Sequence, residues 1–444
     1  MKLKNTLLTL IVLVVVSGQA LSWSNHTLVS KQLLSSMPEV NSAELVKAEA
    51  LTSFLLANEE ELVEFLQSQE EWMEENLWHY APRPDALAFT ATGNADDIRM
   101  RFVRAIRINP NAKLPLYLQL LPGDERAGLI SITPDDVSIF KDKAYLHSIQ
   151  LVQLREGELV SPLDVATSAN DEPDHGLDIG LFTDSNTDYG LEYGFGTQPF
   201  GNPNLEYGTQ APFHMGFYHE SSIVYTLGGF LKRTYPEYRI QLYKQLAEFA
   251  FKSGHDYWGW RFMGWGLHYI GDFSNPYHIT PLPGNSTINT LWVGLQDLLG
   301  YSQAKTDSIQ LVSNRHTALE DFQSLVMNQA YIEKNDQHPT IQALNAPENI
   351  RKYEDDHVIT AISELAYLKA QDIHDILAQT MPNKLVNDAT VEYSQLQVKD
   401  ELIEMVRAKS GEEGLGILVD AISDLLNDFS HNGASYVRSI LKPD

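Results

Sequence analysis

Apolar residues recur three and four positions apart through much of this 444-residue chain, with acids and amides at the positions between them. On an α-helix this spacing gathers the apolar side chains on one face. The pattern therefore predicts a mainly helical, all-α fold with long irregular loops. The helical stretches that it indicates are 42–76, 221–253, 304–333, 350–380 and 394–441.

Two regions depart from the helical pattern. Residues 80–165 contain scattered prolines and the extended stretch "AYLHSIQLVQLREGELV". We interpret them as a small irregular or β insertion in a helical domain at 23–334, followed by a C-terminal helical extension at 335–444. Residues 166–213 form a loop rich in Gly, Asp, Asn and Tyr. So long a loop in a compact protein is usually functional or disordered, and its many aromatic residues favour function.

The chain begins with a short cationic head and the apolar run "LLTLIVLVVV", followed by small residues at Ala20 and Ser22. This arrangement is typical of a secretory signal peptide that is removed after export. We therefore expect cleavage of residues 1–22 and a mature protein that is secreted or periplasmic. Trp23 would then be the first residue, and its free α-amine and carbonyl oxygen can chelate a metal. His26 follows closely enough to complete such a site.

The chain has no cysteine, and its 59 acidic against 32 basic residues give a net charge of −27. Exported proteins commonly rely on disulfides, so this one must be held by a large core or by metals. The negative charge argues against a stable nucleic-acid partner, because such binding relies on Lys and Arg to neutralise phosphates. It leaves room for a small cationic pocket formed by metal ions.

The stretch "HYIGDFSNPYH" concentrates three candidate metal ligands, His268, Asp272 and His278. His268 and Asp272 are four residues apart and share a helix face. Pro276 should end the helix near Ser274, so that His278 folds back beside the same face. The glycines of this helix each cost up to about 1 kcal/mol against alanine. They make sense where another backbone or a metal cluster must approach closely.

A second pair, His316 and Glu320, has the same four-residue spacing on another predicted helix. Together these residues resemble a known family, the zinc-dependent phospholipases C of bacteria with the related single-strand-specific nucleases of fungi and plants. That family begins, after signal removal, with a metal-binding Trp, and "HYIGDFSNPYH" matches its His-x-x-x-Asp-x-x-x-x-x-His segment. The matching positions in this chain are Trp23, His26, His268, Asp272, His278, His316 and Glu320.

The family also carries an Asp and a His in long loops, and here the sequence offers more than one candidate for each. For the His we prefer His214, which ends the irregular loop, over His219. For the Asp we prefer Asp178 over Asp174, both in "EPDHGLD". The acids at 96–97 in "NADDIR" are a weaker rival.

The resemblance implies three zinc ions per chain and hydrolysis of a phosphodiester by a metal-activated water, which Asp178 would also orient. Imidazole and carboxylate ligands without thiolate suit Zn²⁺, although ligand type also admits Mn²⁺ or Fe²⁺. The implied ligand sets are His268, His214, Asp178 and Asp272 for one metal, Trp23, His26 and the bridging Asp272 for a second, and His278, His316 and Glu320 for a third.

Within the family, Glu320 at the last ligand position, the Tyr-rich loop and the acidic surface favour the phospholipase C branch. Its members act on phospholipid head groups, so we expect a phospholipid substrate and transient contact with a membrane surface. Two further functions fit the same residues: a single-strand-specific nuclease or 3′-nucleotidase that uses the same site, and a secreted protein whose metals only hold the fold.

The resemblance covers the mature N-terminus and roughly 170–330. The toxin-like members of the family have a C-terminal β-sandwich for membrane binding, whereas residues 394–441 have helical periodicity, so toxin-like membrane attack is not expected. The remaining histidines have no other candidate ligand at a suitable spacing in the sequence. We interpret them as surface or hydrogen-bonded structural residues. They are His79, His147, His175, His255, His338, His357, His374 and His431.

Overall fold

The computed structural model describes residues 25–124, 128–201, 206–284, 303–396 and 398–442. These residues are mainly helical, with 61 % helix and 3 % strand, which confirms the predicted all-α class. The predicted signal peptide and Trp23 lie outside the described residues.

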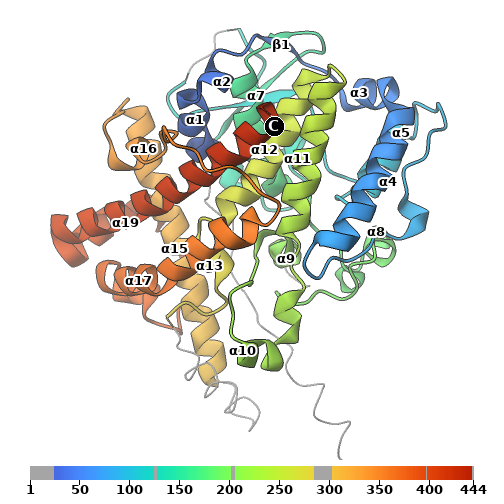
Figure 1. Ribbon diagram of the computed structural model, residues 1–444. Helices are drawn as coiled ribbons and strands as arrows, with labels where there is room; N and C mark the ends of the chain where they lie inside the picture. The colour runs from blue at the N-terminus through green and yellow to red at the C-terminus, as the bar shows by residue number, and fades with distance from the viewer. Residues whose placement is uncertain (1–24, 125–127, 202–205, 285–302, 397, 443–444) are drawn as a thin grey trace, which may run out of the picture.

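Two antiparallel helices, α11 (Pro236–Lys252) and α12 (Asp256–Asp272), lie side by side at the centre of the protein (Figure 1). Every residue of α12 after the first is buried, as expected for a helix with apolar residues on all sides. Three further helices pack against it: α1 (His26–Ser36), α7 (Pro162–Ala169) and α19 (Leu402–Leu441). Helices from distant parts of the chain therefore all pack against α12.

Three glycines of α12 let its neighbours come close. A Cβ on Gly264 would lie 2.5 Å from a backbone oxygen of α7, and one on Gly266 would overlap the Tyr436 hydroxyl of α19. A Cβ on Gly271 would lie 3.0 Å from Nδ1 of His26 on α1. Close packing therefore explains glycines that a helix otherwise tolerates poorly, and Gly271 brings His26 to the C-terminal end of α12.

Long helices build the C-terminal half of the protein: α15 (Gln303–Ile332), α17 (Glu364–Thr380) and α19, which bends at Gly411 (φ 70°, ψ −174°). α15 and α17 both pack against α19, and one hydrophobic core includes residues from Leu28 to Ile440. The boundary proposed before the C-terminal extension stays a prediction. None of the helices in the described part of the chain is long and apolar enough to cross a membrane.

The region predicted as an irregular or β insertion contains strands and also a helix. β2 (Tyr117–Leu120) pairs antiparallel with β3 (Gln150–Gln153), and β1 (Val46–Lys47) pairs antiparallel with β4 (Leu159–Val160). α5 (Ile98–Ala105), which the apolar spacing does not predict, precedes the β2–β3 ribbon. β2 packs against α7, so this ribbon lies beside the helix that leads into the candidate site.

The remaining helices complete the frame around this core. α3 (Leu51–Ala57) packs on α5, and α4 (Glu59–Asn76) packs on α11. The shorter helices are α2 (Pro38–Asn41), α6 (Pro134–Val137), α8 (Asp188–Glu192), α9 (Ala211–His214), α10 (Ser222–Leu227), α13 (Pro276–Ile279), α16 (Pro339–Gln342) and α18 (Asn383–Val386), and a π-helical turn η7 (Val358–Ser363) precedes α17.

Replacing Gly266 with alanine should destabilise the protein by about 1–3 kcal/mol, because the new methyl group overlaps Tyr436 and forces α19 away from α12. Thermal unfolding should show a lower Tm. Gly416→Ala is the control. It adds a methyl group to α19 itself, at a position where nothing lies within 4 Å, and it should be neutral or slightly stabilising. A Gly266→Ala protein as stable as the native one would contradict this packing.

Candidate metal centre

The first two groups of candidate ligands meet at the C-terminal end of α12. His26, Asp174 and His268 form one group, and His214, His268 and Asp272 form the other, with ligand atoms within 4.8 Å of one another in each. Oδ1 of Asp272 lies 3.4 Å from His26 Nε2, while its Oδ2 lies 2.9 Å from His214 Nδ1 and 3.6 Å from His268 Nε2. One carboxylate therefore faces both groups, which is the geometry that a bridging ligand needs.

The third group lies next to these two. Nε2 of His316 lies 2.6 Å from Glu320 Oε1, and Nε2 of His278 lies 3.6 Å from the same oxygen. His316 and Glu320 occupy one face of α15, four residues apart, and His278 comes from α13. The Asn275 side chain donates a hydrogen bond to Glu320 (3.1 Å). Asn275 and His278, on either side of Pro276, therefore both contact Glu320 of α15.

Backbone carbonyls fix two of the imidazole rings. Nδ1 of His268 lies 2.7 Å from the carbonyl oxygen of Asn170, and Nδ1 of His278 lies 2.7 Å from that of His214. A ring that donates from Nδ1 keeps the lone pair of Nε2 for a metal, and such outer contacts are usual for metal-binding histidines. Both Nε2 atoms face the candidate groups.

Several ligand atoms in these groups make no well-aligned hydrogen bond within the described residues, although they lie close to one another. They are Nε2 of His26, His278 and His316, and Oδ1 of Asp272, and all are buried. Buried polar atoms without a partner are rare in native proteins, and here they converge on one another instead of scattering through the core. Nitrogen and oxygen donors without thiolate suit Zn²⁺. The residues present therefore fit divalent metal ions.

Burial also shifts the pKa values of these groups. It raises the pKa of Asp174 to about 7 and that of Glu320 to about 8, and it lowers the pKa of His316 to about 3. Burial alone would lower the pKa of His214, but the carboxylates of Asp272, Asp178 and Asp174 together outweigh this effect and the pKa rises to about 10. Metal ligands must be unprotonated. Metal binding should therefore release protons, and the affinity for metal should increase as the pH rises through the pKa values of Asp174, Glu320 and His214.

Of the two loop acids, the structure gathers Asp174 into a ligand group and places Asp178, the preferred choice, behind His214. Oδ1 of Asp178 accepts hydrogen bonds from Nε (2.9 Å) and Nη2 (2.6 Å) of Arg239, and Oδ2 accepts one from the Tyr269 hydroxyl (2.6 Å). Burial opposes ionisation of Asp178, yet Arg239 lowers its pKa. The choice between the two acids depends on where this arginine lies.

His219, Asp96 and Asp97 lie outside all three ligand groups. His219 is partly buried, and its Nε2 lies 2.8 Å from the Ser363 hydroxyl at the end of η7. Asp97 forms an ion pair with Arg101 (2.7 Å), and Asp96 is exposed. His214 is thus the histidine of its loop that joins the ligand groups.

The segment 170–178, "NDEPDHGLD", contains further acids that sequence reasoning did not single out. Asp171 accepts hydrogen bonds from the backbone N–H of His26 (2.5 Å) and from the Thr27 hydroxyl (3.0 Å). Glu172 accepts hydrogen bonds from the Arg261 guanidinium (2.7 and 3.0 Å) and the Trp265 indole (2.5 Å). One available signal was Arg261, which stands in a largely apolar helix and needs a buried acid as its partner.

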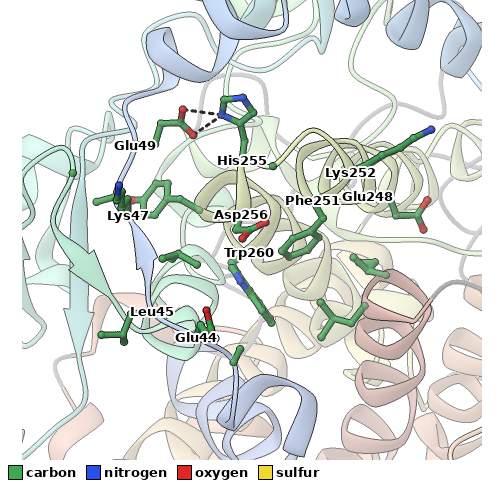
Figure 2. Close-up of a pocket in the computed structure, with 18 of the residues that line it drawn as sticks. Glu44, Leu45, Lys47, Glu49, Glu248, Phe251, Lys252, His255, Asp256 and Trp260 are labelled. Carbon is green, nitrogen blue, oxygen red and sulfur yellow. Dashed lines mark hydrogen bonds and ion pairs between the residues drawn. The ribbon is translucent and has the colours of Figure 1, made fainter.

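A separate cavity of about 1090 Å³ lies at the opposite end of α12 (Figure 2). The Glu49–His255 pair (2.8 Å) and the aromatic ring of Trp260 are among the residues that line it. None of the candidate metal ligands does so. His255 is thus a paired histidine, in agreement with its interpretation as a structural residue.

No protein-family model, curated protein or solved structure matches this chain. Three buried groups of His, Asp and Glu that could hold metal ions are what the structure itself provides. The resemblance to the phospholipase C and nuclease family rests on the order of the motifs in the sequence, and the buried groups are consistent with it.

Glu320→Gln should lower the zinc content of the purified protein by one equivalent per chain, because an amide is a much weaker metal ligand than a carboxylate. Elemental analysis after zinc loading measures it. Asp321→Asn, at the neighbouring position, alters a carboxylate that pairs with Lys399 (2.7 Å) outside the groups and should keep the native content. Equal zinc contents in native and Glu320→Gln proteins would contradict the third group.

Proposed function

We propose that the protein is an exported, zinc-dependent phosphodiesterase of the phospholipase C type. The observation that carries this proposal is the arrangement of three ligand groups in one buried cluster, two of which share His268 and face the same Asp272 carboxylate. The third group is joined to them where His278 contacts the carbonyl of His214. Clusters of closely spaced metals are suited to phosphoryl chemistry, where two oxygens of the reacting phosphate must be stabilised.

The residues of the cluster can be assigned roles. Divalent metals, when bound, supply Lewis-acid charge and an activated water for hydrolysis. His268 and Asp272 are fully buried, so charges held by them are weakly screened and attract phosphoryl oxygens strongly. Among the candidate ligands that the structure describes, Asp174 is the most exposed, at 6 %. In this proposal it takes the ligand position that the sequence assigns to Asp178.

A phospholipid substrate is favoured over a nucleic acid. The chain carries a net charge of −27, which repels a polyanion more than a zwitterionic head group. Glu320 stands where the phospholipase branch of the family has Glu. Transient contact with a membrane surface would follow from this substrate.

The proposed ligation by the chain terminus requires Trp23 to reach the cluster. Asp171 holds the backbone N–H of His26 (2.5 Å), and Nε2 of His26 lies 3.4 Å from Asp272 Oδ1. Three residues of chain extend at most about 11 Å. A free amine at Trp23, exposed by removal of residues 1–22, can therefore be placed near the group that contains His26.

The zinc-loaded protein should hydrolyse a chromogenic phosphocholine diester and lose this activity in a chelator, with recovery when zinc is returned. Single-stranded DNA should be cleaved poorly or not at all, because the acidic surface repels it. Parallel assays on both substrates measure the preference. Cleavage of DNA alone would assign the protein to the nuclease branch, and zinc binding without either activity would leave metals that only hold the fold.

A mature protein with one extra glycine before Trp23 should bind one zinc less tightly and lose at least about tenfold in diester hydrolysis, because acylation removes the amine as a ligand. The same glycine added after the C-terminal residue is the control and should have no effect. Zinc titration and diester cleavage are compared for the two proteins. Full activity of the N-terminally extended protein would rule out the terminal ligand.

A further inference from the structure

Asp178 is fully buried and faces the ring of His214 on the side opposite the ligand groups. Its Oδ2 lies 3.4 Å from Nε2 of His214, whereas Nδ1 of the same ring lies 2.9 Å from Asp272 and 3.2 Å from Nε2 of His268. The imidazole of His214 thus stands between a carboxylate that belongs to a ligand group and one that does not.

Both oxygens of Asp178 already have donors. Oδ1 receives two hydrogen bonds from Arg239, and Oδ2 receives one from Tyr269. A guanidinium in direct contact with a carboxylate neutralises it and repels a nearby dication. These contacts suit Asp178 to hold an imidazole N–H and not to bind a metal itself.

Arg239 is itself held in place by the end of α5. Its Nη1 donates to the carbonyl of Ile106 (2.9 Å) and its Nη2 to the carbonyl of Arg107 (2.8 Å). The side chain of Arg107 is fully buried, and its guanidinium lies over the rings of Phe195 (4.4 Å) and Tyr238 (5.0 Å). A rigid chain of contacts therefore runs from α5 through Arg239 to Asp178.

We propose that Asp178 is a positioning residue: held by Arg239 and Tyr269, its carboxylate orients the ring of His214 so that Nδ1 faces Asp272 and His268. This inference rests on the proposed metal-dependent function. A carboxylate behind a metal-binding histidine fixes the ring and strengthens it as a ligand, and its loss typically weakens metal affinity about 10- to 100-fold. The 80–165 region, through the end of α5, acquires a role as the anchor of this chain of contacts.

Asp178→Asn tests the proposal, with Glu172→Gln as the matched control. Glu172 is also a buried carboxylate that pairs with an arginine and a second side-chain donor, Arg261 and Trp265, but it belongs to none of the ligand groups found in the described residues. Tyr269→Phe, which removes one hydroxyl, is a milder variant that folds more securely. Zinc affinity is measured by competition with a chromophoric chelator, zinc content by elemental analysis, and the proton position on His214 by long-range ¹H–¹⁵N NMR of the zinc-loaded protein.

We expect Asp178→Asn to weaken zinc binding about 10- to 100-fold while the zinc content at saturation stays native. Tyr269→Phe should weaken it less, and Glu172→Gln should stay within about threefold of native. The native spectrum should show the proton of His214 at Nε2. Loss of a whole zinc equivalent in Asp178→Asn would make Asp178 a ligand and overturn the proposal, as would native affinity or an equal effect of Glu172→Gln.

These outcomes are separable from the proposed function. A native protein that binds zinc and shows the expected affinity differences, but cleaves no diester, would support the positioning role and refute the phosphodiesterase. A protein that cleaves the diester but is unaffected by Asp178→Asn would do the reverse.

Discussion

The burial of carboxylates is the constraint on which this structure depends. An ionised acid inside a protein costs several kcal/mol unless a cation or several donors face it. Arg239 faces Asp178, Arg261 faces Glu172, and the backbone of α1 faces Asp171. Three further acids have imidazoles as their nearest charged neighbours: Asp174, Asp272 and Glu320. Asp174, Asp272 and Glu320 are also the acids that belong to groups able to hold metals. Asp178, Glu172 and Asp171 instead receive hydrogen bonds from an arginine or from the backbone and support the groups from outside.

α12 joins this polar cluster to the apolar core. Aromatic residues fill its first turns, and the ligands His268 and Asp272 stand in its last turn, all of them buried. Glycines allow α7, α19 and α1 to approach its backbone. Helices from three parts of the chain therefore pack closely against α12 and fix its position. The ligands on α12 are thereby fixed by packing, which supplies rigidity that a cysteine-free chain cannot obtain from disulfides.

The sequence predicts the class of fold and much of the candidate site, because both depend on short-range spacing. Apolar periodicity indicates the long helices, and the four-residue spacings place His268 with Asp272 and His316 with Glu320 on common faces. The spacing does not distinguish Asp174 from Asp178, since both stand in one loop and what sets Asp178 apart is its contact with the distant Arg239 and Tyr269. α1 and α5 also escape prediction: α5 is short, and the N-terminus of α1 is held by Asp171, 145 residues away. Trp23 lies outside the described residues, so its role stays a prediction.

The candidate ligands within the described residues are drawn from positions 26 to 320 of the chain. Contacts between residues so far apart form late in folding, because the entropy of closing long loops opposes them until the intervening structure exists. A partly folded or incomplete chain therefore cannot present the full ligand set. Metal binding would therefore follow folding of the whole domain, and the bound ions would slow its unfolding.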